Sequence, residues 1–332
     1  MNTLTNVYIS GFKYVTITNR LKVAALPSTL AANWRKIIAT LLMVTLVILA
    51  YSILTAGYEG FKDLVSWKGL ASFTVLMAGW FISAVRLKYL VGKIYGYRLS
   101  LKASLKARLL GGLVANITPS AIGGEPARAA FLRKIMGKDI EELYALALYE
   151  VYYDVILVNT VALIPALLYI PVSIPVVLVA SFMVTSWLAM SYFIKRNSGR
   201  SNNSLLLKIS ARLPAFYERF VKFSNGYREI SSKIGFTGVL VLVALTIAYN
   251  TTWGLAIFFL AGGNYLLEGV IAYYFMMSMG SIPTPGGSIS SEYGLSIILP
   301  PSIVVSYRTL FYYSTILIGF VVAARELAQG NG

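Results

Sequence analysis

The sequence predicts an all-α protein that crosses a membrane about six times. Apolar residues make up 57% of its 332 residues, charged residues only 13%, and the mean hydropathy is +0.70. A water-soluble chain carries about a quarter charged residues, so this chain has too few to cover a globule in water. Several uncharged stretches reach about 20 residues, the length that a helix needs to cross the hydrocarbon of a bilayer.

Six helices are expected to span the membrane. They comprise 37–58, 69–85, two helices that share 155–194, one helix within 234–267, and 302–324. Pro171 and Pro175 divide 155–194, because proline lacks the N–H that a helix interior requires. The first of these two helices is expected to begin near Leu143, and Arg86 is expected at the end of 69–85.

Lysine and arginine are unevenly distributed between the connections. With the N-terminus inside, the cytoplasmic connections 86–108 and 195–233 hold seven and nine basic residues, whereas 170–175 and 261–268 hold none. Cytoplasmic connections collect Lys and Arg, so we expect a multi-pass protein of the cell membrane with both termini in the cytoplasm. The net charge of +16 then indicates contact with anionic headgroups and not with nucleic acid.

These expectations divide the chain into two membrane halves. The segments are a basic interfacial segment (1–35), a first half (36–194), a basic cytoplasmic connection (195–235), a second half (236–326) and a tail (327–332). Lys102, Lys106 and Arg108 of the first half are expected to anchor it at the cytoplasmic headgroups, with the gathering of anionic lipid as an alternative.

Two segments, 99–137 and 269–301, are apolar enough to enter a membrane but contain helix breakers. The breakers are Pro119, Gly123 and Gly124 in the first and Pro285, Gly286 and Gly287 in the second. We expect two re-entrant hairpins of half-length helices, the first entering from the cytoplasm and the second from outside. Since the flanking spans run in opposite directions, the two units would form an inverted repeat, as in secondary transporters. The alternative is two ordinary helix–loop–helix connections at the surface.

Each break is followed by residues that favour a helix start. Proline is preferred at the first helical position, where Pro126 stands after Gly124-Glu125, and Ser288 is expected to cap a second helix after Gly286-Gly287. Two helix N-termini that point into one cavity would attract an anion, and phosphate is the natural anion for a chain surrounded by phospholipid. The alternative is that these glycines only permit tight turns.

Ionisable residues within the apolar segments complete the candidate site. They are Glu125, Arg128, Glu150, Asp154, Glu292 and Arg308. Such groups are costly inside a membrane and usually face a cavity or one another. Two hypotheses therefore stay open, an internal ion-pair network and a set of substrate contacts. Four carboxylates against two arginines also leave room for a coupling proton.

The candidate substrate-binding residues are found at both breaks and in the helices that follow them. They are Gly123, Gly124, Glu125, Arg128, Glu150, Asp154, Pro285, Gly286, Gly287, Ser288, Glu292 and Arg308. The chain has no Cys and no His, so imidazole acid–base chemistry is excluded and no metal site is expected. No nucleotide-binding loop is visible and no cofactor is expected.

Several of these motifs resemble a known family. Thr118-Pro-Ser-Ala-Ile-Gly-Gly-Glu-Pro-Ala-Arg128, the pair Glu150 and Asp154, Ile282-Pro-Thr-Pro-Gly-Gly287 with Glu292, and Arg308 resemble the lysylphosphatidylglycerol synthetase transmembrane-region family over roughly residues 35–326. That family includes the membrane part of the multiple peptide resistance factor.

The resemblance implies a flippase-like transporter and not an enzyme. Its implied substrate is a membrane phospholipid or a polyprenyl-phosphate-linked lipid that moves between leaflets. Full synthases carry an aminoacyltransferase domain that these residues do not include, so lipid aminoacylation is not expected. An intramembrane enzyme acting on a lipid phosphate and a small-solute transporter stay as alternatives, the former weakened by the lack of histidine.

Overall fold

A computed structural model of the chain describes residues 34–118, 123–197 and 213–330. The predicted interfacial segment before residue 34, most of the first break (119–122) and part of the basic connection (198–212) lie outside the described residues. The described part is all-helical and contains eleven α-helices. Six of them are long and apolar enough to cross a membrane, which confirms the six predicted spans.

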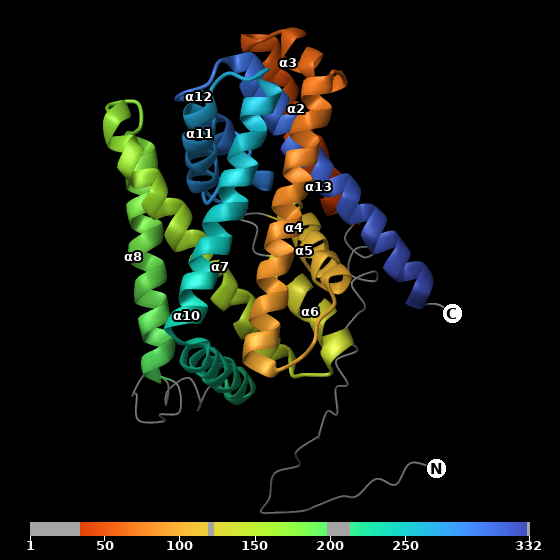
Figure 1. The fold of residues 1–332 in the computed structure, drawn as a ribbon, viewed down its shortest axis with the longest axis vertical. Helices are drawn as coiled ribbons and strands as arrows, with labels where there is room; N and C mark the ends of the chain where they lie inside the picture. Colours follow the sequence, from red (N-terminus) through yellow and green to blue (C-terminus); the bar gives the residue numbers. More distant parts are fainter. Residues whose placement is uncertain (1–33, 119–122, 198–212, 331–332) are drawn as a thin grey trace, which may run out of the picture.

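The described helices comprise six long and five short ones, and Figure 1 shows their arrangement. The long helices are α2 (Trp34–Thr55), α4 (Trp67–Tyr95), α7 (Ile140–Ala166), α8 (Ile174–Asn197), α10 (Pro214–Leu260) and α13 (Pro301–Gly330). The short helices are α3 (Glu59–Lys62), α5 (Leu101–Asn116), α6 (Gly124–Met136), α11 (Leu266–Met279) and α12 (Ser290–Ser296).

Helix α4 is ten residues longer at its C-terminal end than the sequence indicated. It begins after Ser66, whose side chain accepts a hydrogen bond from the Lys68 N–H at 3.2 Å. It ends at Gly96, which adopts a left-handed conformation (φ 63°) suited to glycine. Arg86 therefore lies inside the helix and not at its end.

The predicted basic connection is partly helical. Helix α10 begins at Pro214 and bends at Gly235, where the backbone leaves the helical conformation (φ 64°, ψ 173°). The part before Gly235 lies across one end of the bundle, and the part after it rises through the bundle (Figure 1). The predicted tail is also partly helical, because α13 continues to Gly330.

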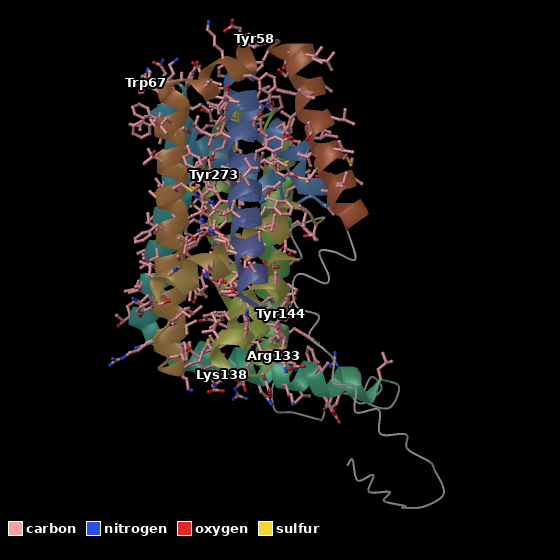
Figure 2. The ribbon with its side chains drawn as sticks, turned by 90° about the vertical axis from the view of Figure 1, so that its right-hand side faces the viewer. Tyr58, Trp67, Arg133, Lys138, Tyr144 and Tyr273 are labelled. Atoms are coloured by element: carbon pink, nitrogen blue, oxygen red, sulfur yellow. The ribbon has the colours of Figure 1, made fainter. Side chains whose placement is uncertain are left out.

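The two pairs of short helices lie in opposite halves of the bundle. Figure 1 shows α5 and α6 in one half and α11 and α12 in the other, each pair between two long helices. Figure 2 marks the two ends of the molecule, with Arg133 and Lys138 at one end and Tyr58 and Trp67 at the other. We call the first the basic end. The pair α5–α6 lies in the half that contains it.

Helix α4 packs closely along α10. The rings of Trp80 and Trp253 make an edge contact at 5.0 Å, and the Trp253 indole N–H donates to the Leu76 carbonyl at 3.1 Å. Gly79 makes this contact possible, because a Cβ there would lie 2.3 Å from Trp253 Nε1. Outside this core, large apolar side chains of α2 and α8 stay exposed, as expected for surfaces that face lipid.

Replacing Gly79 with alanine should destabilise the bundle. The added methyl group overlaps the Trp253 ring, and overpacking of this kind costs about 1–3 kcal/mol. Gly92→Ala is the matched control on the same helix, because its Cβ would meet only the Tyr97 carbonyl oxygen at 3.9 Å. Thermal unfolding in detergent should show a lower midpoint for Gly79→Ala and no decrease for Gly92→Ala. Equal midpoints for the two variants would contradict the packing described.

Candidate functional site

The two helix breaks meet at a cavity of about 520 Å³. The first break connects α5 to α6 and the second connects α11 to α12. Asn116 and Gly124 line the cavity from the first, and Gly286 and Gly287 line it from the second. Gly286 has a left-handed conformation (φ 58°), and a Cβ there would lie 3.4 Å from the Asn116 carbonyl oxygen. Segments about 170 residues apart in sequence therefore lie in contact.

A buried carboxylate of α7, that of Glu150, holds three arginines beside this cavity. Arg86 of α4 donates from Nε to Glu150 Oε1 at 3.0 Å, and Arg128 of α6 donates from Nη1 to Oε2. Arg108 of α5 places Nη1 3.4 Å from the same Oε2. The exposed fractions are 1% for Glu150, 0% for Arg86, 9% for Arg108 and 4% for Arg128. One carboxylate thus connects four helices.

Asp154, one turn further along α7, extends this cluster to α10. Arg86 binds both of its carboxylate oxygens, with Nη2 2.9 Å from Oδ2. The Tyr249 hydroxyl of α10 donates to Oδ1, and Thr246 Oγ1 accepts from Arg86 at 2.6 Å. The Arg86 guanidinium also lies 4.9 Å from the centre of the Tyr249 ring, a cation–π distance.

A second ion pair lies at the other break. Arg308 of α13 donates from Nε to Glu292 Oε1 of α12 at 2.8 Å, and from Nη2 to the Gly286 carbonyl. Its guanidinium lies 5.6 Å from the centre of the Tyr312 ring. The Tyr312 hydroxyl donates to the Asn116 carbonyl at 3.4 Å. Arg308 and Tyr312 therefore connect α13 to both breaks.

The cavity divides the predicted site residues into two groups. Those that line it are Gly124, Glu125, Arg128, Asp154, Gly286, Gly287 and Arg308, and those that do not are Gly123, Glu150, Pro285, Ser288 and Glu292. Glu150 and Glu292 instead contact the arginines that do line it.

Ser288 does not cap the second short helix as the sequence indicated. Helix α12 begins two residues later, at Ser290, and the residue that precedes it is Ile289 with φ 73°. Among the described residues, the buried Ser288 hydroxyl has no hydrogen-bond partner. The backbone turns twice in left-handed conformations at Gly286 and Gly287 before it can enter a helix, which displaces the helix start.

Sequence analysis missed two members of the charge cluster, Arg86 and Arg108. Arg86 was placed at a helix end and Arg108 at the headgroups, but both are buried. The pair Glu150 and Asp154 could have indicated a further arginine partner, because carboxylates one helical turn apart present two acceptors to one guanidinium group. With these two residues, four arginines face four carboxylates in the described clusters. The described clusters therefore contain no more carboxylates than arginines, and the excess that left room for a coupling proton is absent from them.

Three arginines and two carboxylates contribute to the cavity surface. Arg108, Arg128 and Arg308 are the cations, and Asp154 and Glu125 are the anions. Asp154 is bound by Arg86, whereas Glu125 Oε1 lies 3.7 Å from Arg128 Nη2. Glu125 is thus the less tightly held of the two carboxylates.

Arg128 also keeps a hydrogen-bond donor without a partner. Its Nε is buried and unpaired among the described residues. A buried unpaired donor is costly.

Large apolar and aromatic side chains form another part of the cavity wall. Trp80, Trp253 and Phe311 line it from α4, α10 and α13, and Met183 and Trp187 line it from α8. Charged donors on one part of a wall and apolar side chains on another suit an amphipathic molecule.

Comparisons with known proteins identify a family for this chain. A family model described as the lysylphosphatidylglycerol synthase transmembrane region matches residues 20–321. A UPF0104 membrane protein of Archaeoglobus fulgidus is 23% identical over 290 residues, which cover 79% of this chain and 87% of that protein. No solved structure matches the chain.

Replacing Glu150 with glutamine should strongly destabilise the protein. It removes the negative charge that three buried arginines share, and breaking a buried ion pair costs about 3–5 kcal/mol. Glu142→Gln is the matched control on the same helix, because Glu142 is 38% exposed and lies 3.8 Å from Lys138. An exposed pair of this kind contributes at most about 1 kcal/mol. The free energy of unfolding in detergent tests this difference, and equal losses in both variants would contradict it.

Proposed function

Since the chain belongs to the lysylphosphatidylglycerol synthase transmembrane-region family and is a multi-pass membrane protein, we propose that it moves an anionic lipid between leaflets. The substrate class is a phospholipid or a polyprenyl-phosphate-linked lipid. The observation that carries the proposal is the position of Arg108, Arg128 and Arg308 on one cavity at the junction of the two breaks.

In this proposal both pairs of short helices are re-entrant hairpins. The four helices have 16, 13, 14 and 7 residues, so at about 1.5 Å per residue none reaches the 30 Å or so of a bilayer core. Irregular backbone is tolerated at membrane depth where it is buried in protein or lines a cavity. The breaks support this placement, because Thr118 of the first break and Gly286 and Gly287 of the second line the cavity.

The order of the helices supports an inverted repeat. Helices α4, α5, α6 and α7 follow the order long, short, short, long, and so do the rising part of α10, α11, α12 and α13. The two short pairs lie in opposite halves of the bundle (Figure 1). We place the basic end in the cytoplasm, because Lys and Arg collect on that side, and we keep the prediction that both chain termini are cytoplasmic.

The lipid phosphate would bind to the arginines of the cavity. Guanidinium groups bind phosphate oxygens through paired N–H donors, and Arg108, Arg128 and Arg308 line the cavity. The N-terminus of α6 at Gly124 adds backbone dipoles that favour an anion. Glu150 and Glu292 hold the arginines from behind, so they balance charge without filling the cavity.

The apolar wall would receive the glycerol or acyl part of the lipid. Met183 and Trp187 of α8 contribute to it, and α8 also presents exposed apolar side chains to the surrounding lipid. The acyl tails would therefore stay in the bilayer while the headgroup enters the cavity. In a transporter of this type, the two repeats rock around a fixed site near the bilayer midplane.

Lipid hydrolysis, the alternative to lipid binding, would depend on one carboxylate of the described cavity wall. An enzyme acting on a lipid phosphate needs an available base or nucleophile. Asp154 is held by Arg86 and Tyr249, which leaves Glu125 as the less constrained carboxylate on the described cavity wall.

Reconstitution in liposomes tests the proposal. Purified protein should make headgroup-labelled phosphatidylglycerol accessible to an external quencher. Arg128→Ala and Arg308→Lys should slow this movement about tenfold or more, since a hydrogen bond to a charged group contributes about 1.5–3 kcal/mol. Arg133→Ala is the matched control, because Arg133 is an exposed arginine of the same helix as Arg128 and lies at the basic end (Figure 2).

The outcomes of this assay separate the alternatives. Folded Arg128→Ala and Arg308→Lys proteins that move lipid at the wild-type rate would show that the assigned site is wrong. Release of inorganic phosphate from a polyprenyl phosphate would favour the enzyme. Uptake of a small solute without movement of labelled lipid would favour the small-solute transporter.

A further inference from the structure

A second pocket lies at the basic end, apart from the central cavity. Its volume is about 360 Å³, and it lies between the start of α5, the end of α6 and the last turns of α13. Its polar lining includes Lys102, Lys106, Lys134 and Glu326, and its apolar lining includes Phe131 and Ile135. None of these six residues lines the central cavity. We propose that this pocket binds the phosphate group of an anionic lipid from the adjacent leaflet.

The charge of the pocket is the first argument. Glu326 is the carboxylate of its lining, and it faces three ammonium groups. Its Oε1 lies 2.5 Å from Lys106 Nζ and its Oε2 lies 3.7 Å from Lys134 Nζ. Lys102 forms no ion pair with the described residues. Three cations and one anion leave a net charge of 3 − 1 = +2, which the single negative charge of a lipid phosphodiester would partly balance.

The placement of the lysines is the second argument. Lys102 and Lys106 are four residues apart and so share a face of α5, while Lys134 comes from the neighbouring helix α6. Lysines near helix ends extend their ammonium groups to the membrane interface, and basic pockets between helices on the cytoplasmic side bind anionic headgroups. The side chain of Lys134 is 62% exposed, so the pocket is accessible to a ligand from outside.

The apolar side of the pocket favours a lipid over a free phosphate ion. Phe131 and Ile135 are four residues apart on α6 and lie beside the lysines. Such a wall offers contact area to the glycerol and upper acyl carbons of a lipid, whereas an inorganic ion would leave it without a partner. The shared chemistry is a phosphate ester, and the source that we assign is the bilayer.

Glu326 gives the proposal a distinctive consequence. It connects α13 to the first hairpin by binding Lys106 and Lys134, so a lipid phosphate would compete with it for the same ammonium groups. Removing its charge should therefore strengthen lipid binding. A purely structural ion pair predicts only a loss of stability from the same change.

Native mass spectrometry of the purified chain in detergent, titrated with phosphatidylglycerol, tests this inference. Lys102→Gln/Lys134→Gln should weaken one phosphatidylglycerol binding event about 20- to 30-fold, because each lysine near a membrane surface contributes about 1 kcal/mol. Glu326→Gln should tighten the same event. Lys93→Gln is the matched control, since it removes one exposed lysine from the last turn of α4, outside the pocket. It should bind like the wild type.

The opposite results would overturn the assignment. Unchanged binding by the double variant, or weaker binding by Glu326→Gln, would show that these residues only connect helices. Equal binding of phosphatidylcholine would exclude recognition of anionic charge, and equal competition by inorganic phosphate would exclude a lipid. Arg128→Ala should slow lipid transport but leave this binding event intact. The binding assay therefore tests the second pocket independently of the proposed transport.

Discussion

The arrangement of this protein depends on the carboxylate of Glu150. It lies on α7 and binds arginines of α4, α5 and α6, all of them buried. Unpaired guanidinium groups in a membrane interior would be very costly. The shared carboxylate compensates part of that cost from behind the arginines, so Arg108 and Arg128 can present donors to the cavity. Under the proposed function, a structural ion network and a ligand site are therefore two roles of one cluster.

The helix breaks determine where those donors are available. Gly286 lets the second break approach the carbonyl of Asn116 at the end of α5, and Arg308 binds the carbonyl of Gly286. A side chain at Gly286 would meet Tyr312 at 2.9 Å as well as strain the backbone. The cavity thus belongs to both short-helix pairs. Under the proposed function, a site shared by two inverted units suits exchange between the two sides of a membrane.

The sequence predicted the six spans because uncharged apolar stretches of about 20 residues are typical of membrane-spanning helices. It also located both breaks, since proline and glycine disrupt helices independently of tertiary contacts. It did not identify Arg86 and Arg108 as partners of Glu150, because their pairing depends on the rotation and depth of three separate helices. The start of α12 was misplaced for a related reason. Two left-handed glycines, Gly286 and Gly287, delay it to Ser290, and the first of them packs against Asn116 and Tyr312.

A cryo-electron microscopy map of the protein in a nanodisc of anionic phospholipid would test the central claim most directly. The account predicts that both breaks lie side by side at the middle depth of the bilayer. It also predicts headgroup density in the cavity between Arg128 and Arg308. Breaks located in the aqueous region outside the bilayer core, or a cavity closed off from the lipid, would contradict it.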